Sequence, residues 1–248
     1  MRFDDKIALV TGGASGIGKA TVMAFAQKGA TVICADVDAV KGAELKKETA
    51  ATNLKIDFVA IDMANSDTIR AAATEVLKRY PRIDILVNAA GWGDIQPYLQ
   101  NSPEFINRVI AINLAGPAHL TQALLPPMIA ANGGKIINIA SDAGRVGSSG
   151  ETVYAGAKGG LIAFTKSLAR EVARYSINVN CVCPGPTDTP MLATRPEKLR
   201  EAFLKAIPFR RFAKPDEIAE AVMFFASPQS DYVTGQVMSV SGGLTFAG

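Results

Sequence analysis

The chain has 248 residues, a length that suits one large α/β domain, and its 48% apolar and 20% charged residues are typical of a globular protein. Its net charge of +3 and the absence of any Lys/Arg run argue against nucleic acid as a partner. The chain has one histidine and three cysteines in apolar runs, so we expect no metal site, reduced thiols and a cytoplasmic location. We expect no signal peptide, because residues 1–6 lead directly into a strand, and no membrane partner, because no apolar run is long enough to span one.

Apolar strand-like runs alternate with helical patterns along the whole chain. Strands are expected at 7–10, 31–35, 56–61, 83–87, 135–139, 177–182 and 235–243. Helices are expected at 19–28, in a segment ending at 48, and at 67–80, 103–125, 153–175 and 215–226. This alternation predicts an α/β fold with a doubly wound, mostly parallel sheet of about seven strands, the Rossmann fold. We expect residues 1–248 to form a single domain, since no repeat or linker interrupts them.

A glycine-rich turn connects the first expected strand to the first helix, and it contains Gly12, Gly16 and Gly18. Glycines there would let the backbone approach a pyrophosphate, which would lie at the N-terminus of the helix. The spacing differs from the usual G-x-G-x-x-G, and the alternative is an ordinary tight turn between a strand and a helix.

Asp36 closes the second expected strand, close to where a ribose-binding acid is expected. Its carboxylate would accept hydrogen bonds from the 2′- and 3′-hydroxyls of the adenosine ribose and would repel a 2′-phosphate. Val37 and Asp38 follow and supply no arginine for such a phosphate. The position therefore predicts NAD as the cofactor, and the alternative is a strand-end turn residue without a ligand.

Three further strand ends carry polar or small residues. Asp62 and Met63 follow the third strand and either contact adenine or form the turn that caps the next helix. Asn88–Gly91 ends the fourth strand in small residues, as if a ligand passed close by, and Trp92 either lines a pocket or covers the core. The Pro/Gly loop 184–190 ends the sixth strand, at the edge where open α/β sheets bind ligands.

The residues with the clearest chemistry are Ser141, Tyr154 and Lys158. Tyr154 and Lys158 are four residues apart, so they share one face of a helix. A cation about 4 Å from the phenol, at an effective dielectric near 20, is worth roughly 4 kcal/mol, which would lower its pKa from ~10 towards ~7. Such a tyrosine can exchange a proton with an alcohol or carbonyl oxygen at neutral pH, while Ser141 holds the same oxygen. The alternative is a half-buried tyrosine and a surface lysine on an ordinary amphipathic helix.

Taken together, these motifs resemble those of the short-chain dehydrogenase/reductase family over the whole chain. The resemblance rests on Thr11-Gly12-x-x-x-Gly16-x-Gly18, Asp36, Asp62, Asn88-Ala-Ala-Gly91, Asn113, Ser141, Tyr154-x-x-x-Lys158, Pro184-Gly185, Thr187 and Thr189. Ala89 departs from the family pattern, which usually has a second asparagine there.

The resemblance implies four catalytic residues: Tyr154 as general acid/base, Lys158 lowering its pKa and holding the nicotinamide ribose, Ser141 orienting the substrate oxygen, and Asn113 holding a water that links Lys158 to solvent. It also implies a homotetramer built by the last strand and the helix of Tyr154. The implied NAD contacts are Gly12, Ser15, Gly16, Ile17, Gly18, Asp36, Asp62, Met63, Asn88, Gly91, Tyr154, Lys158, Pro184, Gly185, Thr187 and Thr189.

Segments 141–160, 183–189 and 196–208 are similar to NAD-linked 2-hydroxycyclohexanecarboxyl-CoA dehydrogenases and to related 1-arylethanol dehydrogenases. This similarity implies oxidation of a ring-bearing secondary alcohol to a ketone. One alternative is a 3-oxoacyl reductase of fatty-acid synthesis, which runs the same chemistry backwards; such enzymes usually prefer NADPH, and Asp36 argues against that cofactor. Another is a non-catalytic dinucleotide sensor, against which the intact catalytic set argues.

The segment 191–214 is an irregular insertion that we expect to cover the pocket as a lid. Its charges are Arg195, Lys198, Arg200, Lys205, Arg210, Arg211 and Lys214 against Glu197 and Glu201. Basic groups at the mouth of a cleft favour an anionic substrate such as an acyl-CoA. The alternative is that they keep the lid soluble and that the substrate is a neutral alcohol. The expected apolar lining is Trp92, Val146, Met191, Leu192 and Phe203.

Overall fold

A seven-stranded parallel sheet lies at the centre of the computed structural model, which describes residues 1–246. Its strands are β1 (Ile7–Thr11), β2 (Thr31–Asp36), β3 (Lys55–Ala60), β4 (Ile85–Asn88), β5 (Gly134–Ile139), β6 (Ile177–Pro184) and β7 (Val237–Val240). They follow the order β3-β2-β1-β4-β5-β6-β7, so the predicted doubly wound sheet of seven strands is confirmed.

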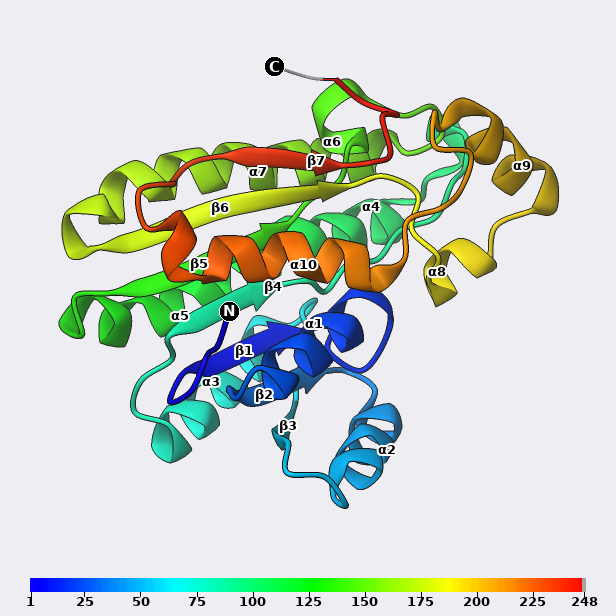
Figure 1. Cartoon of the computed structure of the whole chain (residues 1–248). Coiled ribbons are helices and arrows are strands. Elements are labelled where there is room, and N and C mark those ends of the chain that lie inside the picture. The colour runs from blue at the N-terminus through cyan, green and yellow to red at the C-terminus, as the bar shows by residue number, and fades with distance from the viewer. Residues whose placement is uncertain (247–248) are drawn as a thin grey trace.

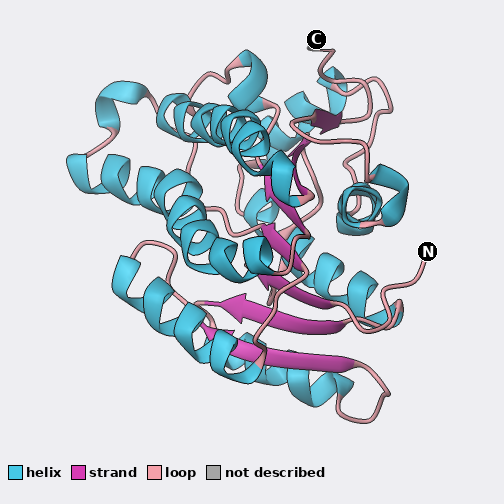
Figure 2. Cartoon of the chain, turned by 90° about the vertical axis from the view of Figure 1, so that its left-hand side faces the viewer, coloured by secondary structure: helices cyan, strands magenta, loops and turns pink. Residues whose placement is uncertain are grey.

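Helices cover both faces of this sheet (Figure 2). The helices are α1 (Gly16–Gln27), α2 (Ala39–Thr49), α3 (Ser66–Arg79), α4 (Pro103–Ile110), α5 (Gly116–Ala130), α6 (Ala143–Val146), α7 (Thr152–Val172), α8 (Pro190–Ala193), α9 (Glu197–Ala206) and α10 (Pro215–Ala226), with short 3₁₀ turns at Tyr98–Gln100, Ala173–Tyr175 and Pro228–Ser230. Because both faces are covered, the strands read as nearly continuous apolar runs, such as the fully buried 32–35 in β2. Among residues 1–246, none of the helices has the length and hydrophobicity that a bilayer crossing needs.

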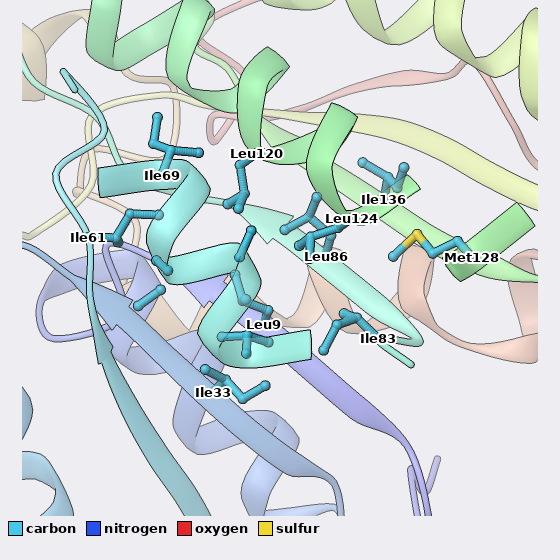
Figure 3. Close-up of a cluster of buried hydrophobic side chains, with 14 of the residues drawn as sticks. Leu9, Ile33, Ile61, Ile69, Ile83, Leu86, Leu120, Leu124, Met128 and Ile136 are labelled. Atoms are coloured by element: carbon cyan, nitrogen blue, oxygen red, sulfur yellow. The ribbon is translucent and has the colours of Figure 1, made fainter. Parts of the chain in front are cut away.

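Two apolar clusters fix the two layers. On one face, α3, α5 and α7 pack on the sheet, and Figure 3 places Ile69 of α3 and Leu120 of α5 over Leu9 and Leu86 of the strands. On the other face, α1, α2 and α10 form the second cluster, with Phe25 and Phe225 fully buried. Apolar packing on both faces therefore holds the sheet in place, and its strand ends position the side chains that follow them.

The strand order reverses between β1 and β4, which are neighbours in the sheet although β2 and β3 separate them along the chain. In open α/β sheets a ligand crevice forms outside the carboxyl ends of the strands at such a reversal. The arrowheads of β6 and β7 in Figure 1 point to the side on which α8 and α9 lie. The predicted insertion 191–214 thus lies at the edge where a ligand is expected.

The structure differs from the sequence prediction in one helix that bears on the site. The single helix expected at 103–125 is divided into α4, a π-helical turn at Ala111–Ala115, and α5, which continues to Ala130. Asn113 lies in the π-helical turn and its side chain donates to the Val109 carbonyl at 2.8 Å. Wide turns of this kind are frequent at functional sites.

Candidate active site

The glycine-rich turn between β1 and α1 is held in place by close backbone packing. Gly12 has a φ of +65°, and a Cβ there would lie 2.9 Å from Cα of Ala90. A Cβ on Gly18 would lie 2.0 Å from the carbonyl oxygen of Gly12. The Thr11 hydroxyl accepts hydrogen bonds from the N–H groups of Ala89 and Ala90, both at 3.0 Å, which joins the ends of β1 and β4.

A cleft of about 440 Å³ opens between this turn, the ends of β4, β5 and β6, and the segment 191–214. It brings together most of the predicted residues. Those that line it are Gly12, Ser15, Gly16, Ile17, Gly18, Gly91, Ser141, Val146, Tyr154, Lys158, Pro184, Gly185, Thr187, Thr189, Met191, Leu192 and Phe203. Pyrophosphate, nicotinamide and substrate positions expected from sequence therefore share one cavity.

Ser141 follows β5, and Tyr154 and Lys158 lie on successive turns of α7. The Ser141 hydroxyl accepts from the Ala143 N–H at 3.1 Å and also hydrogen-bonds the Tyr154 phenol. Lys158 is 2% exposed, its ammonium donates to the Ile139 carbonyl at 2.8 Å, and Nζ lies 5.7 Å from the centre of the Tyr154 ring. The three side chains can therefore act on one substrate oxygen and one cofactor.

The electrostatics of this set differ from the prediction. Burial raises the pKa of the Tyr154 phenol above its usual value, and the nearby Glu151 carboxylate adds to the rise, whereas the Ser141 hydrogen bond lowers it. Burial also lowers the pKa of Lys158 to about 8. The expectation that Lys158 alone brings the Tyr154 pKa towards neutrality is wrong in this arrangement, because desolvation penalises both charged forms.

Asn113 is fully buried and its amide is engaged by backbone groups. Nδ2 donates to the carbonyls of Trp92 and Val109, at 2.6 and 2.8 Å, and Oδ1 accepts from the Trp92 N–H at 3.2 Å. A Cβ on Gly91 would lie 3.3 Å from Asn113 Oδ1 and 3.5 Å from Lys158 Nζ. Asn113 and Lys158 thus face the same small space beside Gly91, and the water expected to link them stays a prediction.

Asp36 lies at the end of β2, is 8% exposed, and supports the glycine-rich turn. Its Oδ2 accepts from the Ala14 N–H at 2.9 Å and its Oδ1 from the Asp38 N–H at 3.0 Å. An ionised carboxylate has about four acceptor sites, so these two bonds leave capacity for ribose hydroxyls.

Asn88 does not line the cleft. It is buried under the end of β4, where Nδ2 donates to Asn138 at 2.8 Å and to Thr121 at 3.3 Å, and Asn138 in turn donates to Thr165 at 2.8 Å. The structure places it in a polar ladder that joins β4 and β5 to α5 and α7. Its role as a direct NAD contact is therefore not supported by its position, because strand pleating turns its side chain into the core.

Asp62, Met63 and Trp92 are also not among the residues that line the cleft. Asp62 Oδ1 accepts from the Ala64 N–H at 2.8 Å, in the turn before α3, and Met63 is buried against the start of α5. The centroid of the Trp92 ring lies 5.3 Å from the centroid of the Phe105 ring and 4.3 Å from the guanidinium carbon of Arg108. Asp62 thus forms a turn and Trp92 packs on a neighbouring helix, while the adenine contact of Asp62 and a pocket-lining role of Trp92 stay predictions.

Several cleft residues were not predicted as site residues. They are Ala89, Ala90, Gly93, Ile95, Ile139, Ala140, Asp142, Ala143, Ser148, Glu151, Pro186, Pro190, Arg195, Leu244 and Thr245. Most of them are next to predicted motifs in the sequence, so this proximity alone could have identified them as cleft residues. For Arg195 the only signal was its place among the lid charges, which does not distinguish an inward from an outward side chain.

A family model described as enoyl-(acyl carrier protein) reductase matches residues 12–245. The chain is 43% identical to a 3-oxoacyl-[acyl-carrier-protein] reductase of Thermotoga maritima, covering 98% of this chain and 99% of the relative. It is 38% identical to a subunit of (2S)-[(R)-hydroxy(phenyl)methyl]succinyl-CoA dehydrogenase of Thauera aromatica, with all of both chains covered. It is also 38% identical to a galactitol 2-dehydrogenase of Agrobacterium fabrum, covering 98% of each chain.

A solved structure agrees with these relatives. The crystal structure of gox2181 superposes with a TM-score of 0.94 and 30% sequence identity, covering 98% of this chain and 96% of that one. Similarity in both sequence and fold therefore extends over nearly the whole chain, with the cleft inside the matched region.

Proposed function

This chain belongs to the short-chain dehydrogenase/reductase family, and on that premise we propose that it interconverts a secondary alcohol and a ketone on a carrier-bound acyl group, with NAD as its cofactor. The observation that carries the proposal is the convergence of Ser141, Tyr154 and Lys158 in one cleft beside the glycine-rich turn.

The residues present fit a dinucleotide. Gly16 has a φ of +50°, and a Cβ there would lie 3.2 Å from the Thr189 methyl group, so the turn leaves room only for backbone. The first N–H groups of α1 begin at this turn and favour an anion. Ser15, Gly16 and Ile17 would hold the pyrophosphate, Asp36 the adenosine ribose, and Thr187 and Thr189 the nicotinamide side.

A bound nicotinamide would supply the acceptance or return of a hydride. The chain's own part is to hold one oxygen and move one proton. Ser141 donates to the substrate oxygen and keeps it against Tyr154. In the oxidation, the Tyr154 oxygen, once it is ionised, takes the proton of the alcohol as the C–O bond becomes a carbonyl; in the reduction, the neutral phenol returns that proton. Lys158, with its pKa lowered to about 8, exchanges a proton near neutral pH and can restore the protonation state of the site.

The carrier-bound acyl group is supported by the names of two relatives. One acts on a 3-oxoacyl group of acyl carrier protein and the other on a hydroxy(phenyl)methyl-succinyl group of CoA, so both names combine an acyl carrier with a hydroxyl or oxo group. The comparisons favour the 3-oxoacyl reductase alternative over the ring-bearing alcohol that we expected first. The ring-bearing acyl-CoA remains the second candidate, because the phenyl-bearing relative matches all of this chain.

NAD remains our proposed cofactor, on the strength of Asp36. In the double variant Asp36→Ala, Val37→Arg, a cation replaces the acid that would repel a 2′-phosphate, and the preference for NAD over NADP should narrow or reverse. The homotetramer and the cytoplasmic location stay predictions.

The test is a substrate panel, read by absorbance of the reduced cofactor, with NAD(H) and NADP(H) in parallel. It should contain a linear 3-oxoacyl-CoA and its 3-hydroxy form, a 2-hydroxycycloalkanecarboxyl-CoA, and a 1-arylethanol. We expect turnover of at least one acyl-CoA with NAD(H) and little with NADP(H). Efficient oxidation of the arylethanol with no acyl-CoA turnover would refute the acyl proposal. Equal use of both cofactors would refute the role of Asp36.

A further inference from the structure

Arg195 joins the lid to the wall of the cleft. It lies between α8 and α9, yet only 9% of its side chain is exposed, and it lines the cleft together with Tyr154. Its guanidinium forms an ion pair with Asp94 and donates to the Gly93 carbonyl at 3.0 Å. Asp94 itself is 64% exposed at its side chain, so the buried member of the pair is the cation.

The backbone that Arg195 holds is in contact with Tyr154. A Cβ on Gly93 would lie 3.0 Å from Cδ2 of the Tyr154 ring, so the glycine backbone packs directly on the phenol. The next residues are tied to the loop before α7, where the Gln96 N–H donates to the Gly150 carbonyl at 3.0 Å. Segment 93–96 is therefore fixed by the lid on one side and by the start of α7 on the other, with Tyr154 beside it.

Charges of opposite sign flank the phenol. The titratable groups that face Tyr154 are Glu151 at the N-cap of α7, Lys158 on α7, Arg195 from the lid and Cys183 from β6. The Glu151 carboxylate raises the pKa of Tyr154 and the Arg195 guanidinium lowers it. Both side chains line the same cleft but lie outside the predicted catalytic set.

We propose that Arg195 is a positioning residue for Tyr154: it clamps the Gly93–Asp94 backbone against the phenol ring and places a positive charge at the cleft that opposes Glu151. This inference rests on the proposed acid/base role of Tyr154. It also gives the segment 191–214 a specific task, since its Arg195 supplies a positive charge to the cleft that Tyr154 lines.

The experiment compares pH profiles of kcat/KM for alcohol oxidation in Arg195→Met, Arg195→Lys, Asp94→Asn and Glu151→Gln. We expect kcat/KM to rise with pH as the Tyr154 phenol ionises. Arg195→Met removes a positive charge and should move this rise to higher pH, whereas Glu151→Gln removes a negative charge and should move it to lower pH. Asp94→Asn breaks the same ion pair but leaves the cation, so it should raise KM without moving the rise to higher pH. Arg195→Lys keeps the charge and should restore the position of the profile while KM stays raised.

A purely structural clamp predicts the same profile for Arg195→Met and Asp94→Asn, and that result, or an unmoved profile in Arg195→Met, would overturn the inference. If circular dichroism shows that Arg195→Met does not fold, the test rests on two other variants. The pH profile of kcat/KM should move to lower pH in Glu151→Gln and keep its position in Arg195→Lys. A Tyr154→Phe variant measured alongside distinguishes failure of the proposed function from failure of the inference about Arg195. Normal turnover there refutes the proposed function, whereas loss of turnover with unmoved Arg195 profiles refutes only this inference.

Discussion

The glycine-rich turn and the lid both line the cleft, but they are fixed in opposite ways. In the turn, position is set by backbone packing, with Gly12 and Gly18 against other main-chain atoms and Asp36 buried beneath them. In the lid, α9 buries no residue, and the segment 191–214 is held by a few side chains such as Leu192, Ile207 and Arg195. The part of the cleft that we propose for the cofactor is therefore held by backbone packing, whereas the part that we propose for the substrate depends on individual side-chain contacts.

The largest effect on turnover is expected from substitution of Tyr154. Tyr154→Phe keeps the ring that packs on Gly93 but removes the proton acceptor, so turnover should fall by roughly a thousandfold. NAD binding, measured by calorimetry, should be retained. The matched control is Tyr175→Phe, which lies in the 3₁₀ turn after α7 and outside the cleft and should leave turnover unchanged. Turnover in Tyr154→Phe within a few-fold of the parent would contradict the mechanism.

The rigidity of the turn can be broken at Gly18. In Gly18→Ala the new methyl group would lie 2.0 Å from the Gly12 carbonyl oxygen, and neither backbone can move without shifting β1 or α1. We expect the free energy of unfolding to fall by about 3 kcal/mol or more, because such overpacking is costly. The control is Gly156→Ala on α7, where a methyl group meets no atom within 4 Å and helix propensity predicts a gain of about 1 kcal/mol or less. Chemical denaturation measures both, and equal stabilities would show that the turn is not under this constraint.

The burial of the Lys158 ammonium should lower the stability of the folded chain, and this effect can be tested by its pH dependence. Its folded pKa of about 8 lies below the ordinary 10.5, so between these values the folded state binds fewer protons than the unfolded state. The contribution of Lys158 to the stability of the parent chain should therefore rise with pH through that window and be lowest below it. The shift corresponds to about 3 kcal/mol, and losing the bond to the Ile139 carbonyl costs about 1 kcal/mol.

We therefore expect Lys158→Met to be inactive but more stable than the parent by about 2 kcal/mol well below pH 8. The advantage should disappear above pH 10.5, where Lys158 is neutral in both states. Denaturation curves across this range provide the measurement. A variant that is less stable at every pH would mean that Lys158 is not a desolvated cation in the folded protein.

The same contrast explains what the sequence could predict. The glycine-rich turn, the strand ends and Tyr154–Lys158 were predictable because backbone geometry and helix spacing impose local requirements on residue type. The direction of the Asn88 side chain could not be predicted, because a strand-end residue can face the cleft or the core and only the packing of α5 and α7 decides between them. The direction of the Tyr154 pKa was wrong because burial, which depends on the whole fold, outweighs a neighbour four residues away. Arg195 was unresolved because its partner, Asp94, lies far away in sequence.

The smallest effect is expected from the exposed charges of the lid. Of its cations, Arg195 is paired with Asp94 and Arg211 forms a two-bond ion pair with Glu217, at 2.6 and 2.7 Å, so part of the basic excess is neutralised. Lys198 and Lys205 of α9 are exposed and remain available to attract an anionic substrate. Counter-ions screen such attraction within about 10 Å at 0.1 M salt.

If the substrate is an acyl-CoA, Lys198→Gln together with Lys205→Gln should lower kcat/KM by about two- to tenfold at low salt, because each exposed charge contributes little. The difference from the parent should shrink as salt is added, and turnover of a neutral alcohol should hardly change. Lys55→Gln is the matched control, since Lys55 is equally exposed but begins β3, at the opposite end of the sheet from the cleft. An acyl-CoA rate that is insensitive to both salt and the lid variants would mean that these charges only solvate the lid. The substrate half of the site would then be defined by Arg195 and the apolar lining alone.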